Sequence, residues 1–220
     1  MVLPIFFFCI SSQSFSQKHE VGIGIGASAY SGEIVQYLDV RNLRPSGQVY
    51  YRFNFSDVVS MKVAASLGVL YAADKKYNNA MAEYRNAEFT DSYNDLNILF
   101  EYNFLNYGYK NKQDRGKFSP YLTAGFGILN YNNDKSDPDH IVNTSFQPVI
   151  PFGGGIKYRI DAHWSFNWQF IATKTFTDDL DGIYNKSGYT KAIANPSTTD
   201  WYYYTGVSVG YIFWKIHCPE

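Results

Sequence analysis

Four histidines, two cysteines and one acidic segment are the parts of this chain best suited to chemistry. A lipid-modifying enzyme would need a serine or similar nucleophile and a histidine base within hydrogen-bond reach. His140 stands alone in a long polar segment. The other histidines, His19, His163 and His217, fall near the predicted ends of strands, and with Cys218 they could in principle bind zinc. Because their spacing matches no metal motif, we expect separate solvated residues.

Two further segments resemble ligand loops only in part. The acidic run from Thr177 to Gly182 has the residue types of a calcium loop, but it lacks the full D-x-[DN]-x-[DN]-G spacing and the terminal Glu. The run Gly153 to Gly155 is no phosphate loop, because no helix follows it. Glycine there would let a strand curve or let bulky side chains approach the backbone. We therefore predict no enzyme, no metal, no cofactor and no small-molecule substrate.

Charge and composition restrict the function further. Nineteen Lys and Arg residues nearly balance 20 Asp and Glu residues, so the basic surplus that binds nucleic acid is missing. A length of 220 residues suits one barrel or one soluble domain. Aromatic residues make up 19% of the chain, and Tyr and Trp favour an apolar surface that ends at water. This composition is typical of a barrel with aromatic girdles.

The N-terminal residues are predicted to be an export signal. An apolar run from Val2 to Ile10 is followed by small polar residues and by Ser14-Phe15-Ser16, which resembles a cleavage site. The run is too short to cross a bilayer as a helix. We therefore divide the chain into a signal peptide, residues 1–16, and a barrel, residues 17–220. Cys9 lies in the signal peptide and is removed with it. We therefore expect Cys218 to be the single cysteine of the barrel, without an internal disulfide.

Eight segments alternate apolar and polar residues with period two, the pattern of strands with one apolar and one wet face. In the second segment, for example, Val49 and Tyr51 alternate with Tyr50 and Arg52. The segments are 20–30, 46–55, 59–71, 95–104, 118–131, 151–159, 164–173 and 201–213. An even number of strands fits a closed, antiparallel, up-and-down barrel with both termini at one end. The predicted fold class is therefore an all-β, eight-stranded transmembrane barrel of the outer-membrane type.

The links between these segments are alternately short and long. The links at 56–57 and 160–163 are tight, whereas those at 31–44, 72–91, 132–145 and 174–200 are long. One link on the short side, 105–117, is longer and basic. Outer-membrane barrels pair short periplasmic turns with long outer loops. We therefore predict an integral protein of a bacterial outer membrane, with both termini in the periplasm and membrane lipid as its surroundings.

The position of the charges distinguishes a membrane barrel from a soluble ligand carrier, whose interior is apolar. Six charged residues fall on the polar face of the strands: Arg52, Lys62, Asp95, Glu101, Lys157 and Arg159. In lipid, Lys or Arg at mid-bilayer costs about 2–4 kcal/mol. We therefore expect these side chains inside a narrow lumen, paired with one another and with Gln and Asn so that they fill it. The alternative is that some of them line a narrow polar conduit.

Five stretches of the chain resemble one family. They are 51–55 (YRFNF), 118–127 (FSPYLTAGFG), 151–158 (PFGGGIKY), 174–181 (KTFTDDLD) and 200–213. In these stretches the sequence resembles the small outer-membrane barrels of Bacteroidota typified by PorG, a component of the type IX secretion machinery. The Phe-Ser-Pro-Tyr and Thr-Phe-Thr-Asp stretches are the most specific. The family also contains relatives without an assigned role.

The resemblance implies a non-enzymatic barrel that anchors or helps to assemble the secretion and gliding machinery. It also implies contacts with a periplasmic lipoprotein and its soluble ring partner, and it transfers no catalytic residue. For such a contact the sequence offers the basic link and the C-terminal tail, with Lys110, Lys112, Arg115, Lys117, Trp214 and His217 as candidates. The main alternative is a general structural or adhesive small barrel. A lipid-modifying enzyme or a narrow pore is a less favoured alternative.

Overall fold

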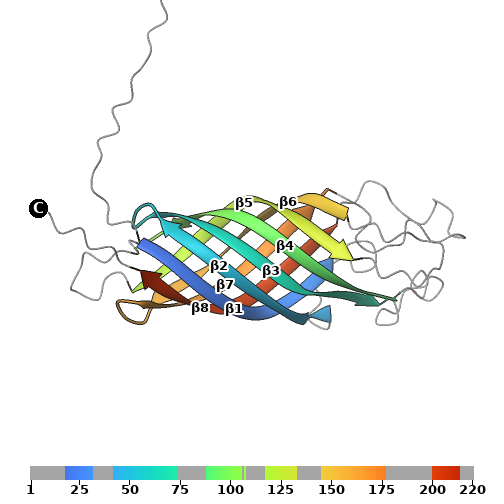
Figure 1. Ribbon diagram of the computed structural model, residues 1–220, viewed down its shortest axis with the longest axis horizontal. Coiled ribbons are helices and arrows are strands. Elements are labelled where there is room, and N and C mark those ends of the chain that lie inside the picture. Colours follow the sequence, from blue (N-terminus) through green and yellow to red (C-terminus); the bar gives the residue numbers. More distant parts are fainter. Residues whose placement is uncertain are drawn as a thin grey trace, which may run out of the picture.

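Eight antiparallel strands form a closed barrel in the computed structural model of the chain (Figure 1). Each strand pairs with its neighbours in sequence, and β8 closes the barrel by pairing with β1. The strands are β1 (Lys18–Ser31), β2 (Arg44–Asn54), β3 (Val59–Ala73), β4 (Glu88–Asn103), β5 (Phe118–Asn132), β6 (Ser145–Arg159), β7 (Trp164–Thr175) and β8 (Trp201–Phe213). The predicted fold class is confirmed.

The structure describes residues 18–31, 42–73, 88–105, 107, 117–132, 145–176 and 200–213. Within these ranges, no helix is long and apolar enough to cross a membrane. The predicted signal peptide and the acidic segment 177–182 lie outside the described residues, as do His140, His217 and Cys218.

Most strands begin and end within two residues of the predicted segments, but β4 and β6 begin earlier. Strand β4 begins at Glu88 rather than Asp95. Its first residues include polar side chains on both faces, so the period-two pattern did not predict this part of the strand. Strand β6 begins at Ser145 rather than Pro151. Pro148 interrupts the early part of its sequence, and proline lacks the N–H that a strand ladder uses.

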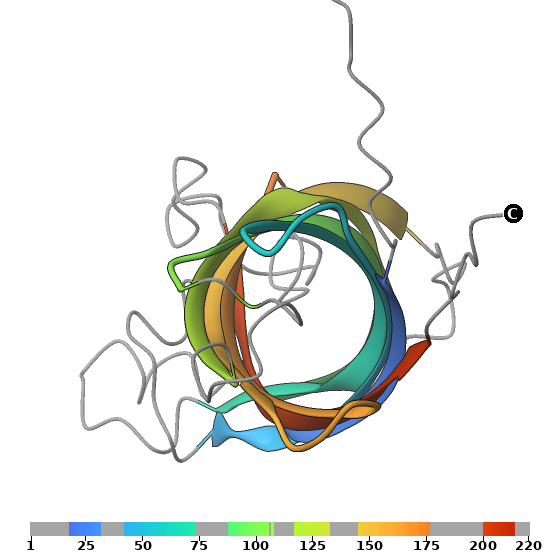
Figure 2. The same cartoon turned by 90° about the vertical axis from the view of Figure 1, so that its left-hand side faces the viewer.

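The two ends of the barrel differ in their connections. We call the end where β1 starts and β8 finishes the turn end; it lies on the left in Figure 1 and faces the viewer in Figure 2. There β2 and β3 are joined by residues 55–58, and β6 and β7 by residues 160–163. At the opposite end, the loop end, the links span 32–43, 74–87, 133–144 and 176–200. The third link at the turn end, 104–117, is as long as some of the loops, as the sequence predicts. Otherwise short and long links alternate, which also agrees with the sequence.

Side chains close both tight turns at the turn end. Asp161 Oδ1 accepts hydrogen bonds from the backbone N–H groups of His163 at 2.7 Å and Trp164 at 2.8 Å. These two bonds hold the pKa of Asp161 below its usual range. In the other turn, Ser56 Oγ accepts from the N–H groups of Val58 and Val59. Such local bonds are typical of Asx and Ser turns, and they fix the register of the two hairpins.

The barrel turns its large apolar side chains outward and its polar side chains inward. Ile23, Leu67 and Phe126 are 69%, 64% and 57% exposed on the outside. Along β8, buried residues alternate with half-buried or exposed ones from Trp201 to Phe213. Figure 2 shows the strands as a ring around one lumen. This is the opposite of a soluble carrier barrel, whose apolar face points inward.

Candidate functional site

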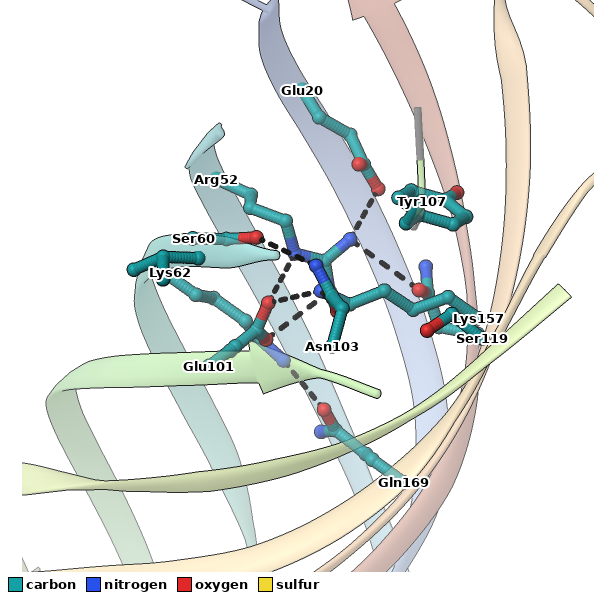
Figure 3. Close-up of polar contacts among 12 residues, drawn as sticks. Glu20, Arg52, Ser60, Lys62, Glu101, Asn103, Tyr107, Ser119, Lys157 and Gln169 are labelled. Atoms are coloured by element: carbon teal, nitrogen blue, oxygen red, sulfur yellow. Dashed lines mark hydrogen bonds and ion pairs between the residues drawn. The ribbon is translucent and has the colours of Figure 1, made fainter. Parts of the chain in front are cut away.

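A charged residue from β2 joins two carboxylates inside the lumen near the turn end (Figure 3). Arg52 is fully buried, and its Nη1 lies 2.7 Å from Oε1 of Glu20 on β1. Its Nε lies 2.8 Å from Oε2 of Glu101 on β4. A guanidinium offers donors in several directions, so one arginine can hold two carboxylates that come from different walls.

The chain of charges continues to the far wall through Lys157 on β6. Its Nζ lies 2.7 Å from Glu101 Oε2 and donates to Asn103 Oδ1 at 2.8 Å. Charges therefore alternate in sign across the lumen. We call Glu20, Arg52, Glu101 and Lys157 the charge cluster. The cluster draws its members from β1, β2, β4 and β6. Its contacts at Glu101 join β2 to β4 and β4 to β6, strands that do not pair directly.

Neutral side chains supply further hydrogen bonds to the charge cluster. Glu20 Oε1 also accepts from Tyr50 Oη at 2.8 Å and from Ser165 Oγ at 2.7 Å. Asn167 donates to Tyr50 Oη at 2.9 Å. Gly210 makes room for this group, because a Cβ atom there would lie 2.6 Å from Tyr50 Oη. Buried charges need such partners, since isolated charges are costly to remove from water.

Lys62 lies beside the charge cluster and binds an amide instead of a carboxylate. Its Nζ donates to Gln169 Oε1 at 2.5 Å and lies 4.8 Å from the centre of the Tyr50 ring. Gln169 in turn donates to Gln48 Oε1 at 2.8 Å, and Gln48 donates to Ser66 Oγ at 3.1 Å. The buried ammonium is thus connected to β2, β3 and β7 by a chain of amides and a hydroxyl.

Tyr107, from the link between β4 and β5, fills the mouth of the lumen at the turn end. It is 4% exposed, and its N–H donates to the Asp57 carbonyl at 3.0 Å. Arg159 Nη2 donates to the Tyr107 carbonyl at 3.4 Å, and the Arg159 guanidinium lies 4.7 Å from the ring centre. Burial, together with the nearby charge of Glu20, raises the pKa of Tyr107 to about 12. The ring therefore enters the lumen as a neutral group.

A second layer, made of tyrosines, fills the lumen near the loop end. Tyr30, Tyr93 and Tyr202 are at most 1% exposed, and we call them the tyrosine layer. Tyr202 Oη donates to Asp95 Oδ2 at 2.8 Å, and Tyr30 Oη donates to Asp200 Oδ1 at 2.6 Å. The rings of Tyr93 and Tyr202 lie 5.4 Å apart. Side chains therefore occupy the lumen at two levels.

The structure places all six predicted lumen residues inside the barrel, but in three groups. Arg52, Glu101 and Lys157 meet in the charge cluster, with Lys62 beside it. Arg159 contacts Tyr107 at the turn end, and Asp95 contacts the tyrosine layer. The sequence-based set omits Glu20, the second carboxylate of the cluster. Glu20 lies two residues before Gly22 on the polar face of β1, so extending the alternation by one period would have found it.

The residues predicted to contact a periplasmic partner are mostly outside the described ranges. This holds for Lys110, Lys112, Arg115, Trp214 and His217. Lys117 is described and is exposed at the turn end, directly before β5.

The two described histidines pack against aromatic rings. His19 Nδ1 lies 2.5 Å from Tyr51 Oη, and the His163 ring stacks on Tyr211 with 5.7 Å between ring centres. Among the described residues, no group of three or more His, Cys, Asp or Glu residues could hold a metal ion.

In the glycine run 153–155, Gly155 permits a close approach of the Tyr121 side chain, because a Cβ atom at Gly155 would lie 2.9 Å from Tyr121 Oη.

The apolar exterior and the filled, charged lumen define a class: the small, closed barrels of the outer-membrane type. Within that class, the chain belongs to the family described as "Domain of unknown function (DUF6089)", which its residues 1–219 match. No curated protein sequence matches the chain significantly.

Two solved structures have a similar fold. Neisserial surface protein A aligns with a TM-score of 0.56 and 10% sequence identity, over 89% of this chain and 97% of that one. Ail, the attachment invasion locus protein of Yersinia pestis, was solved in complex with the heparin analogue sucrose octasulfate. It aligns with a TM-score of 0.50 and 11% identity, over 90% of this chain and 99% of that one. At these identities the similarity establishes the fold and nothing beyond it.

Proposed function

We propose that this protein is a non-enzymatic barrel integral to a bacterial outer membrane, with its turn end in the periplasm. There it serves as an anchoring or assembly component of the type IX secretion and gliding machinery. The observation that carries the structural role is the filling of the lumen at two levels, by the charge cluster and by the tyrosine layer. A filled lumen leaves the two ends as the surfaces that meet partners.

The chemistry of the lumen supports a structural role over catalysis. The buried carboxylates of Glu20 and Glu101 bind cations of the same barrel, so neither is available to a substrate. The described histidines contact Tyr51 and Tyr211, and a hydrolase would need one of them next to a nucleophile instead. These contacts stabilise the barrel wall.

The link to type IX secretion rests on the resemblance of the sequence to the PorG-like barrels. In this proposal, the turn end contacts a periplasmic lipoprotein and its soluble ring partner. The contact uses the basic link (Lys110, Lys112, Arg115 and Lys117) and the tail with Trp214 and His217. Basic residues on an exposed link speed the encounter with an acidic partner and add modest affinity.

Affinity capture tests this contact. We expect the detergent-solubilised full chain to retain the lipoprotein and its ring partner. Replacing the four basic residues of the link with glutamine and removing residues 214–220 should weaken retention by about tenfold or more, because each exposed charge contributes about 0.2–1 kcal/mol. The matched control is Lys174→Gln, which removes a cation at the loop end. Unchanged retention by the variant would exclude these residues as the contact.

The second candidate is a general structural or adhesive barrel. It is favoured by the outward side chains Thr90, Ser92 and Asn94 of β4, which are exposed and polar beyond the apolar part of the strand. This extension could present a polar surface outside the membrane. A gene deletion separates the candidates: loss of secreted cargo and of gliding supports the secretion role, whereas a membrane or adhesion defect with normal secretion supports the second. Current through the purified protein, or lipid hydrolysis by it, would instead favour a pore or an enzyme.

A further inference from the structure

Two cations at the loop end stack on aromatic rings, apart from the lumen network. Lys174, near the end of β7, has its Nζ 5.9 Å from the centre of the Trp201 ring, and the two residues are register partners of β7 and β8. Arg44, the first residue of β2, has its Cζ 4.0 Å from the centre of the Tyr71 ring on β3. Both cations are partly exposed, but they belong to different faces of the barrel wall. Arg44 has the parity of the inward residues of β2 and pairs with the buried Ser28 of β1, so it belongs to the lumen side. Lys174 belongs to the outer face. An aromatic ring beneath a cation restricts its position and favours the charged form.

Lys174 belongs to the apolar outer face of the barrel. Along β7 the residues that share its parity are apolar, and all but the small Ala172 are large, including Trp168 and Phe170. Its register partners on either side are Ile150, which is 44% exposed, and Trp201. No other charged residue occurs in β7. The outer face of this strand is therefore an apolar stripe that ends in one cation.

The height of Lys174 matches the edge of a membrane. Lys174 lies ten residues beyond Trp164, which begins β7 at the turn end. At about 3.3 Å per residue and a tilt of about 40°, ten residues cover about 25 Å along the barrel axis, the height of the apolar band of such barrels. Lys174 thus lies at the level where acyl chains meet headgroups.

Neither cation binds a carboxylate of the described part of the chain. The ion pairs found there join Glu20, Arg52, Glu101 and Lys157 within the lumen. An ammonium such as that of Lys174 binds phosphate oxygens as a point charge.

We propose that the Lys174–Trp201 pair binds a phosphate group of an anionic glycolipid in the outer leaflet. This inference rests on the proposed membrane location and orientation. The ammonium of Lys174 holds the phosphate, while the Trp201 ring and adjacent apolar side chains such as Ile150 contact the acyl chains below it.

Lipid retention in bilayer nanodiscs tests the proposal. The full chain is reconstituted in phosphatidylcholine with either phosphorylated or dephosphorylated lipid A, and the bound lipid is counted by native mass spectrometry. We expect the wild type to retain phosphorylated lipid A preferentially. The variant Lys174→Gln should lose about fivefold in retention, since each basic residue near an anionic surface contributes about fivefold. The control Lys117→Gln, which removes an exposed cation at the turn end, should retain as much as the wild type.

Each other outcome overturns the proposal. Equal retention by Lys174→Gln, or equal retention of dephosphorylated lipid A, would show that Lys174 does not bind the phosphate. Full displacement by millimolar inorganic phosphate would indicate a free anion in place of the glycolipid. Electrophoresis without heating confirms that each variant is a folded barrel. If the wild type inserts and shows no preference for lipid A, this inference fails and the membrane proposal stands, whereas failure to insert contradicts the membrane proposal itself.

Discussion

Replacing Arg52 with methionine should destabilise the barrel by about 3–5 kcal/mol, the usual cost of removing one partner from a buried ion network. The substitution keeps much of the side-chain volume but leaves Glu20 and Glu101 buried without their shared guanidinium. Both carboxylates are at most 2% exposed, so water cannot replace the lost partner without opening the barrel. Guanidinium unfolding in detergent, followed by tryptophan fluorescence, measures the change.

The control for this prediction is Lys174→Met, which removes a cation outside the lumen. It should change the free energy of unfolding by less than about 0.5 kcal/mol. A quadruple variant, with Glu20 and Glu101 changed to Gln and Arg52 and Lys157 changed to Met, should recover much of the stability lost by Arg52→Met. The reason is that an unpaired buried charge costs more than a neutral replacement of the whole group. Equal stability of Arg52→Met and Lys174→Met would contradict our description of the cluster.

Opening the lumen should require changes at both of its filled levels. The charge cluster lies near the turn end and the tyrosine layer near the loop end, so they block the same path in series. We expect Arg52→Ala/Glu101→Ala alone, and Tyr93→Ala/Tyr202→Ala alone, to pass no more current than the wild type. The first pair removes one charge of each sign and therefore leaves the net charge unchanged. All four changes together should give steady current in planar bilayers.

A matched control for the current is Phe100→Ala/Phe126→Ala. These two rings face outward and are 50% and 57% exposed, so their removal takes away aromatic volume without touching the lumen. The control should stay silent. Steady current through the wild type would contradict a filled lumen. A silent quadruple variant that still migrates as a folded barrel would contradict the assignment of the block to these two levels and would indicate that other side chains, such as Tyr107, also close the path.

Period-two alternation was sufficient to predict the strands and their polar faces, because a barrel with one apolar surface requires that pattern in every strand. It located Arg52, Lys62 and Lys157 on the polar face from residue parity alone. It failed at the start of β4, where polar residues lie on both faces. Where a strand extends beyond the apolar band, apolar and polar residues no longer alternate, so the sequence pattern no longer predicts the strand.

The pairing of the lumen charges could not be predicted from the sequence. In the structure, Arg52 lies opposite Glu20 on one side and opposite Lys62, a like charge, on the other. Which contact forms depends on the registers between strands and on the directions of long side chains. The contact with Glu101 crosses from β2 to β4, which are not adjacent in the sheet. Tyr107 is a similar case, since nothing in the composition of its link indicates that a ring enters the lumen.

The most direct test of the account is the electrophoretic mobility of the protein extracted from the outer-membrane fraction, compared before and after boiling. A closed barrel resists unfolding by detergent until it is heated, so we predict recovery in that fraction and faster migration of the unheated sample. Recovery in the soluble fraction, with the same mobility before and after boiling, would contradict both the barrel and every proposal made from it.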